Sequence, residues 1–164
     1  MSKTEQHLKE AFAGESQANR KYLAFAAQAD KEGHAAIARL FRAAAHAETV
    51  HAHAHLRVLG GIRDTATNLR EAITGETHEF QKMYPAMIAD AEAEGKTAAV
   101  SSFRHANAVE KLHAALYQKA LANLGKNPDT AYWVCDVCGN TVEGEPPDTC
   151  PICGAKRPAF KKVD

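Results

Sequence analysis

The chain has 164 residues, with 20 basic and 20 acidic side chains and therefore no formal net charge. This length fits one domain with room for a small appendage, and a balanced charge without a basic block argues against a nucleic-acid partner. No apolar stretch approaches the roughly 18 residues that a membrane span needs, and the polar N-terminus lacks the apolar run of a signal peptide. We therefore expect a cytoplasmic protein that binds neither nucleic acid nor membranes.

Four segments have the apolar periodicity of long amphipathic helices. They cover about residues 4–32, 34–59, 65–94 and 97–124. Thr4 is the expected N-cap of the first, and a glycine follows each of the first three. Pro85 lies inside the third segment, and we expect it to kink that helix without ending it, because the apolar period continues beyond it. The sequence thus predicts an all-α four-helix bundle over residues 1–126.

The two helical hairpins are copies of one another. The motif at Glu10–Glu15 recurs at Glu71–Glu76, at an offset of 61 residues. Phe41-Arg42 recurs as Phe103-Arg104 at an offset of 62. Each copy has a glycine directly before its lone glutamate, where we expect a close neighbour. The repeat predicts that the hairpins supply equivalent residues about a pseudo-twofold axis.

A Glu-x-x-His pair occurs once in each copy, and positions i and i+3 lie on one face of a helix. With the lone glutamates, the candidate ligands are Glu15, Glu48, His51, Glu76, Glu110 and His113. Burying so many ionisable groups requires compensation, and this set matches the di-iron carboxylate sites of ferritin-like bundles. Carboxylate and imidazole ligands suit iron or manganese. The alternative is a bundle with exposed Glu and His at chance spacing.

Glu79 departs from the repeat, since its counterpart is Ala18. It follows Glu76 by three residues, so it can add a carboxylate on one side of the site. Tyr22 and Tyr84 lie about two turns beyond the lone glutamates, either as hydrogen-bond donors near the metals or as core tyrosines. The remaining histidines are expected outside the site: His7, His34, His46, His53, His55, His78 and His105.

The last part of the chain, residues 130–164, is a second module that is too small to fold on a hydrophobic core alone. It contains all four cysteines, as the pairs Cys135/Cys138 and Cys150/Cys153. In a reducing compartment this pattern indicates a tetrahedral four-thiolate site for zinc or a single iron. With zinc the module would have a structural or partner-binding role. With iron it would transfer electrons one at a time. A glycine after each pair is expected to let backbone amides point at the sulfurs.

Together, the paired Glu-x-x-His, the Gly-Glu-x-x-Glu of Gly75–Glu79 and the Cys-x-x-Cys…Cys-Pro-x-Cys-Gly module resemble the rubrerythrin family over the whole chain. The resemblance implies a di-iron site and a rubredoxin-type iron, and a peroxidase that reduces hydrogen peroxide to water. It also implies an electron donor such as rubredoxin or an NAD(P)H-dependent reductase, and a homodimer in which each rubredoxin-like module lies beside the partner's di-iron site. The matching di-iron ligands are Glu15, Glu48, His51, Glu76, Glu79, Glu110 and His113. Cys135, Cys138, Cys150 and Cys153 match the thiolate ligands, and Tyr22 and Tyr84 match tyrosines near the di-iron site.

In this family one iron exchanges the extra carboxylate for a histidine on reduction, which here would involve Glu79 and His51. Two other functions remain open from the sequence. One is a ferroxidase that stores iron, although storage needs neither the thiolate module nor Glu79. The other is a helical bundle with a structural zinc ribbon that acts in assembly.

Overall fold

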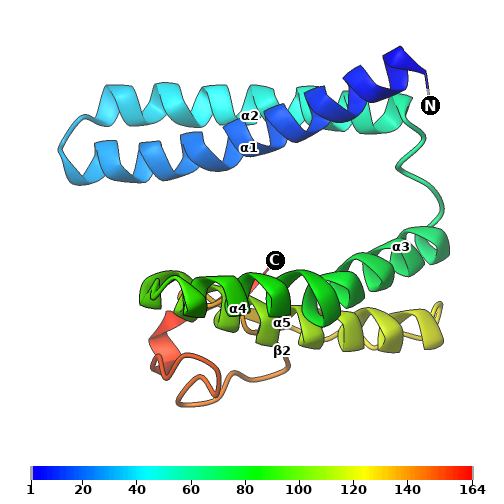
Figure 1. The fold of residues 1–164 in the computed structure, drawn as a ribbon, viewed down its shortest axis with the longest axis vertical. Helices are drawn as coiled ribbons and strands as arrows, with labels where there is room; N and C mark the ends of the chain where they lie inside the picture. Colours follow the sequence, from blue (N-terminus) through cyan, green and yellow to red (C-terminus); the bar gives the residue numbers. More distant parts are fainter. Residues whose placement is uncertain (1, 164) are drawn as a thin grey trace. The chain divides into compact units, whose positions relative to one another are not determined.

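The computed structural model describes residues 2–163, and the chain divides into two compact units, Met1–Arg63 and Asp64–Asp164. Each unit contains a pair of antiparallel helical segments, and the second also contains the small cysteine-rich module (Figure 1).

Unit 1 is a hairpin of α1 (Lys3–Lys31) and α2 (Ala35–Val58). Among the described residues of this unit, the buried positions are all alanines, namely Ala26, Ala29, Ala38, Ala45 and Ala52. Small side chains let the two backbones approach closely, and Asn19 uses this proximity to donate to the Ala45 carbonyl at 2.7 Å. Gly33 adopts φ +82° in the tight turn between the helices, a conformation that favours glycine.

The first helix begins earlier than the sequence indicated. Ser2, and not Thr4, is the N-cap: its hydroxyl accepts from the Glu5 amide at 3.2 Å, and the Glu5 carboxylate accepts from the Ser2 amide at 2.7 Å. This reciprocal capping box satisfies two amides that the first turn would otherwise leave unpaired. The expected cap at Thr4 was wrong because both residue types cap well and the deciding partner is Glu5.

Unit 2 contains α3 (Thr65–His78), the π-turn η1 (Glu79–Met83), α4 (Tyr84–Ala93) and α5 (Thr97–Ala122). The helix continues past Pro85 as expected, since Pro85 lies in the first turn of α4. The sequence did not predict η1, where the Tyr84 amide donates to the Glu79 carbonyl five residues earlier. Turns of this kind are wider than α-helix and hold one extra residue.

The π-turn explains why the repeat changes its offset. The offset is 61 at Glu15 and Glu76, but the ion pair Asp30–Arg42 in unit 1 is matched by Glu92–Arg104 in unit 2, at an offset of 62. One residue has therefore been added between Glu76 and Glu92. Among the described helical residues of that interval, η1 is the segment that is not α-helical, so it contains the added residue.

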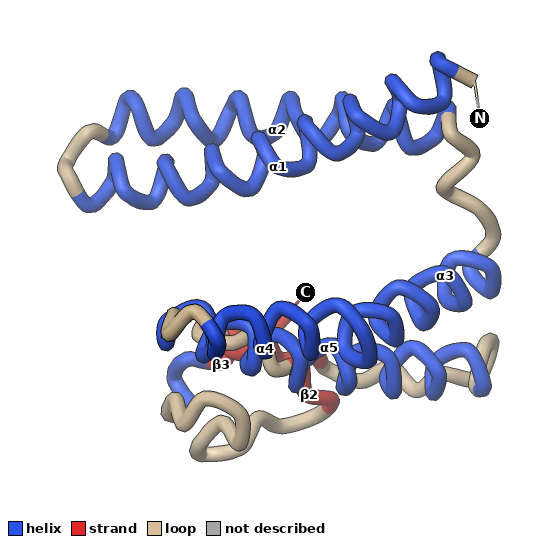
Figure 2. The backbone as a smooth tube through the Cα atoms, in the orientation of Figure 1, coloured by secondary structure: helices blue, strands red, loops and turns tan. Residues whose placement is uncertain are grey.

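The cysteine-rich module is a three-stranded antiparallel sheet of β1 (Tyr132–Cys135), β2 (Thr141–Glu143) and β3 (Phe160–Val163), in the order β2-β1-β3. Its strands are drawn in red in Figure 2, where β2 and β3 are labelled. A short 3₁₀ helix, η2 (Arg157–Ala159), precedes β3. Its core consists of Cys135, Cys150 and Phe160, each at most 4% exposed. Two of these three residues are candidate metal ligands, as expected for a module of this size.

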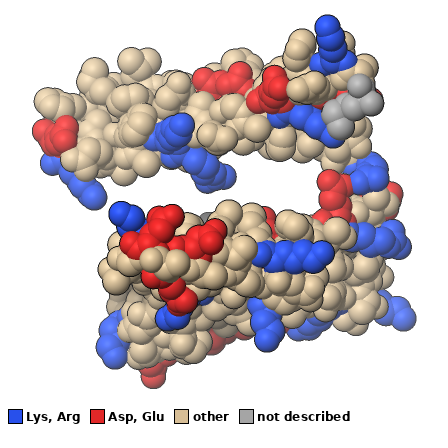
Figure 3. All heavy atoms as spheres, in the orientation of Figure 1, with Lys and Arg blue, Asp and Glu red and all other residues tan. Residues whose placement is uncertain are grey.

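Acidic and basic side chains are both present on each unit in the face drawn in Figure 3, as the balanced composition suggested. None of the helices in the described part of the chain is long and apolar enough to cross a membrane.

Candidate metal centres

The first group of candidate ligands lies within unit 1. Nδ1 of His51 is 2.9 Å from Glu48 Oε2 and 4.0 Å from Glu15 Oε1. Glu48 and His51 come from adjacent turns of α2, and Glu15 comes from the facing side of α1. One donor atom of each residue lies within 4.8 Å of the other two, which is close enough to bind one metal ion.

The second group lies within unit 2 and has nearly the same geometry. Nδ1 of His113 is 2.8 Å from Glu110 Oε2 and 3.7 Å from Glu76 Oε1, with Glu110 and His113 on α5 and Glu76 on α3. The sequence repeat is thus also a repeat of ligand geometry, unit by unit. A side chain added at Gly14 or Gly75 would meet no described atom within 4 Å, so the close neighbour expected at these glycines is absent from the described residues.

The carboxylates of the second group repel one another without a cation. Burial raises the pKa of Glu76 to about 7, and a hydrogen bond to Glu110 and the charges of Glu110 and Glu79 add to this effect. In the metal-free protein, Glu76 therefore keeps a proton up to about pH 7, and its carboxyl group hydrogen bonds to Glu110. A divalent cation can replace that proton and balance both charges, so these residues fit a metal ion.

Glu79 lies near this group but outside it. Its charge helps to raise the pKa of Glu76, so it faces the same region. Its carboxylate does not belong to the set of ligand atoms within 4.8 Å that Glu76, Glu110 and His113 form. It begins the π-turn η1, where the backbone departs from the repeat. None of the seven other histidines belongs to a metal-binding group of the residues described.

The two candidate tyrosines differ in their surroundings. Tyr22 packs against Phe25 and Phe41, with ring centroids 6.3 and 6.2 Å away. Burial raises the pKa of Tyr84, and the charges of Glu110, Glu79 and Glu76 raise it further, so its phenol stays protonated near the carboxylates.

Tyr117 was missed as a site residue and is in a similar position to Tyr84. Burial raises its pKa, followed by the charges of Glu76 and Glu110, and its ring centroid is 6.5 Å from that of His113. Its spacing of one turn from His113 on α5 was the signal that could have identified it.

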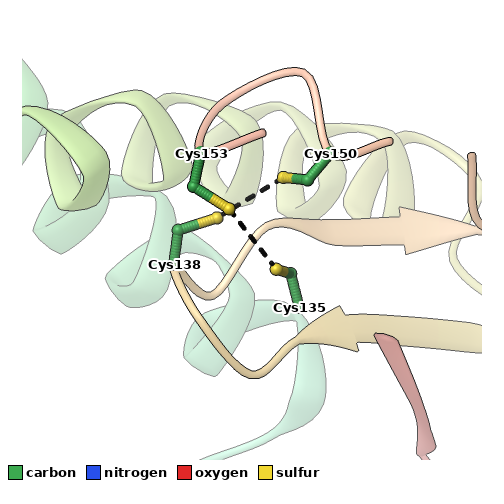
Figure 4. Close-up of side chains that lie close together, drawn as sticks. All are labelled: Cys135, Cys138, Cys150 and Cys153. Atoms are coloured by element: carbon green, nitrogen blue, oxygen red, sulfur yellow. Dashed lines mark hydrogen bonds between the residues drawn. The ribbon is translucent and has the colours of Figure 1, made fainter. Parts of the chain in front are cut away.

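The four cysteines converge in the module (Figure 4). The Sγ atoms of Cys135 and Cys153 are 3.7 Å apart, and those of Cys138 and Cys150 are 3.6 Å apart. A tetrahedral site with metal–sulfur bonds of about 2.3 Å places its sulfurs about 3.8 Å apart, so the cysteines are arranged for one metal ion.

Backbone amides point at the sulfurs, as the glycines after each pair led us to expect. Burial of Cys150 opposes ionisation, but hydrogen bonds from the Cys153 and Ile152 amides lower its pKa to about 6. Burial raises the pKa of Cys138, which the Asn140 amide partly offsets. The buried Asn140 side chain also donates to Cys150 Sγ at 3.6 Å.

The module packs on α5 of its own chain within unit 2, through contacts that the sequence did not reveal. Thr141 Oγ1 is 2.9 Å from Nε2 of His113. Lys119 on α5 pairs with Glu143 on β2, and a side chain added at Gly139 would lie 3.7 Å from Val109. The cysteine-rich module therefore packs along α5, and Thr141 joins it to the Glu76–Glu110–His113 group.

Comparisons with known proteins cover both parts of the chain. The family model described as rubrerythrin matches residues 6–121, and the one described as rubrerythrin, rubredoxin-like domain, matches residues 133–161. Rubrerythrin-2 of Clostridium acetobutylicum is 34% identical over 96% of this chain and 95% of that protein. The rubrerythrin of Porphyromonas gingivalis is 36% identical over 99% of this chain and 90% of its own.

Nigerythrin of Nitratidesulfovibrio vulgaris is 35% identical over 96% of this chain and 85% of its own length. Solved nigerythrin structures, described as a mixed-valence state and a fully reduced, all-ferrous state, match 99% of this chain and 88% of theirs, with TM-scores of 0.60 and 0.61 at 33% identity. These matches confirm the expected fold class, a ferritin-like four-helix protein with a small four-cysteine, rubredoxin-like module. The Glu/His groups and the four cysteines fit iron cofactors.

Proposed function

The chain belongs to the rubrerythrin family, and from this premise we propose that it is a non-haem di-iron peroxidase that acts in oxidative-stress defence. Hydrogen peroxide would accept two electrons and two protons and leave as two molecules of water. The electrons would come from an external donor, such as rubredoxin or an NAD(P)H-dependent reductase, through the iron of the four-cysteine site. Iron held by the Glu/His groups would supply two electrons for cleavage of the O–O bond.

The observation that carries this proposal is the contact between the cysteine-rich module and the second Glu/His group in unit 2. Thr141, three residues after Cys138, hydrogen bonds to His113, a member of the second Glu/His group. A protein that only stores iron does not need a four-thiolate site next to its carboxylate site. A carboxylate site that must receive electrons one at a time does need a four-thiolate site next to it.

We assign the di-iron ligands to both Glu/His groups and to Glu79. The proposed di-iron set adds Glu79 to the two groups: Glu15, Glu48, His51, Glu76, Glu79, Glu110 and His113. Cys135, Cys138, Cys150 and Cys153 would hold the third iron. Tyr84 and Tyr22 are proposed as hydrogen-bond donors near the di-iron site. The raised pKa of Tyr84, due first to burial and then to the carboxylates, supports a donor role for its phenol.

Glu79 and His51 are the pair proposed to exchange at one iron. Five glutamates bring five negative charges, whereas two ferrous ions bring four positive charges and two ferric ions bring six. Replacing a carboxylate by a neutral imidazole on reduction keeps the buried charge closer to balance. The position of Glu79, near the second group but outside its ligand atoms, is compatible with a ligand that binds in one oxidation state.

The experiment is to load the protein with iron, reduce it without oxygen and mix it rapidly with hydrogen peroxide. We expect both iron centres to become oxidised, with one peroxide consumed for every two electrons. The same protein mixed with dioxygen is the comparison. Faster oxidation by dioxygen than by peroxide would overturn the peroxidase proposal and favour a ferroxidase.

Metal analysis and visible absorption distinguish the zinc-ribbon alternative from the proposed iron relay. A ferric four-thiolate site is strongly coloured, and a zinc site is not. Purified protein with zinc in the module and no absorption after iron loading would rule out the proposed relay.

A further inference from the structure

The second ring nitrogen of His113 has a partner in the cysteine-rich module. Its Nε2 lies 2.9 Å from Thr141 Oγ1, and the Thr141 hydroxyl lies 3.0 Å from the Gly139 carbonyl. A hydroxyl has a single proton, so a Thr141 that donates to Gly139 can only accept from His113. His113 must then donate through Nε2, which leaves Nδ1 available for a metal beside Glu110 and Glu76.

We propose that Thr141 is a positioning residue that sets the tautomer and the ring orientation of His113. A hydrogen bond to the second nitrogen of a ligating imidazole commonly fixes both properties and tunes the metal. Here the partner comes from a different module, 28 residues further along the chain. The carboxylate site in unit 2 is thereby completed by the thiolate module.

Thr141 can do this because its own position is fixed. Its residue lies at the start of β2, where Val134 of β1 is its strand partner. Two further features place the module along the same helix. An added Cβ at Gly139 would lie 3.7 Å from Val109, one turn before His113, and Glu143 pairs with Lys119 beyond it. These contacts on either side of Thr141 keep its hydroxyl against the imidazole.

The equivalent histidine of unit 1 lacks such a partner among the residues described. The ring of His51 contacts Glu48 and Glu15 through Nδ1 alone, whereas His113 is bonded through both nitrogens. The His113 side chain is also 26% exposed, compared with 54% for His51. The repeat thus provides two similar histidines, and the cysteine-rich module fixes the tautomer and ring orientation of His113 alone.

The same contacts form a short link between the two iron sites, an inference that rests on the proposed function. Gly139 is bonded to Cys138, and two hydrogen bonds lead from the Gly139 carbonyl through Thr141 to His113. Along this link one electron at a time would pass from a ferrous thiolate iron, which would become ferric, to a ferric ion of the di-iron site, which would become ferrous. Thr141 is the only side chain between the peptide and the imidazole on this path.

The first test examines the imidazole without iron or peroxide. The protein and its variants Thr141→Val and Thr141→Ser, labelled with ¹⁵N-histidine, are filled with zinc and examined by NMR. We expect a slowly exchanging Nε2–H on His113 in the wild type and in Thr141→Ser, because the serine hydroxyl can take the same place. Thr141→Val should lose this protection, and Thr149→Val, which removes an exposed hydroxyl of the same module, should retain it.

An unchanged His113 signal in Thr141→Val would overturn the proposal. If Thr141→Val binds no metal at its cysteines, the module has failed to fold, and Thr141→Ser then decides: a wild-type signal supports the proposal and a lost signal contradicts it. None of these outcomes depends on peroxide, so a failure of the proposed function leaves this test valid.

The second test measures the link in the iron-loaded protein. After anaerobic reduction and addition of peroxide, oxidation of the thiolate iron is followed by its colour. We expect Thr141→Val to slow this phase by about tenfold, the lower range for loss of a residue that orients a metal ligand, and both control variants to match the wild type. Equal rates in Thr141→Val and wild type would refute the link, whereas a wild type unreactive to peroxide would refute the proposed function.

Discussion

Glu79 is the residue that makes the two Glu/His groups unequal. Ala18 occupies its place in unit 1, and its carboxylate adds a negative charge beside Glu76 and Glu110. We expect Glu79→Ala to retain both irons, because the other carboxylates and both histidines remain, and to slow reoxidation by peroxide about ten- to hundredfold. Rapid mixing together with iron analysis measures both quantities.

The matched control is Glu94→Ala, which removes an exposed carboxylate at the end of α4. It should leave the rate unchanged. Wild-type peroxide turnover in an iron-replete Glu79→Ala protein would show that the extra carboxylate is not part of the reaction.

Glu76 gives the metal-free protein an unusual dependence on pH. Its pKa is raised by burial to about 7, so between about pH 4.5 and 7 the folded state holds a proton that the unfolded state has lost. Stability falls as pH rises wherever the folded state binds more protons. We therefore expect the free energy of unfolding of the metal-free protein to decrease across this interval, measured by urea denaturation at a series of pH values.

Replacing Glu76 by glutamine is the control, since an amide cannot ionise and should flatten this part of the profile. Metal binding should also become weaker as pH falls through about 7, because a proton competes with the metal for Glu76. A metal-free wild type whose stability rises through the same interval would contradict the raised pKa.

At the scale of elements, the π-turn η1 is the position where the second hairpin gained a residue. If so, deletion of the exposed Lys82 from η1 should restore continuous α-helix, with α3 and α4 each keeping their register. We expect helical content close to wild type by circular dichroism. Peroxide reactivity should fall as in Glu79→Ala, because the turn that Glu79 begins would be rebuilt.

A deletion within a regular helix should behave differently. Deletion of Lys111 from α5 would rotate Glu110 by about 100° relative to His113 and separate two ligands that now lie 2.8 Å apart. We expect this protein to lose metal and stability. Equal losses of metal and stability in the two deletion variants would argue that η1 does not contain the added residue.

At the scale of the whole molecule, unit 1 indicates an assembly larger than one chain. Its fully buried residues are alanines, while Ile37, Leu40 and Val58 of α2 are 49%, 66% and 72% exposed. Large exposed apolar side chains on a hairpin are typical of an interface, and the resemblance to the rubrerythrin family implied a homodimer. We expect sedimentation to give about twice the 17.7 kDa of one chain.

Leu40→Glu should weaken that dimer by placing a charge in an apolar contact. Val163→Glu is the matched control, since Val163 is 53% exposed and belongs to the cysteine-rich module. A wild-type protein that sediments as a monomer at micromolar concentration would contradict the prediction.

Short-range features were predictable because their geometry is local. Glu110 and His113 meet because an α-helix brings positions i and i+3 together, and Cys135 and Cys138 meet because a turn with Gly139 follows the first cysteine. The helix ends at Gly33 and Gly95 follow from backbone conformations that favour glycine. The exact cap at Ser2 and the π-turn were missed, because several residues suit each local role equally well.

The sequence by itself determined the chemistry of both metal sites: the repeated Glu-x-x-His, the additional Glu79 and the two cysteine pairs are fixed by spacing along a helix or a turn. Only the tertiary structure decided how the sites are connected. Thr141 and Tyr117 acquire their roles from their distance to His113, and Thr141 does so across 28 residues of chain. No local periodicity encodes such a contact, because it depends on how a folded module packs against a folded helix.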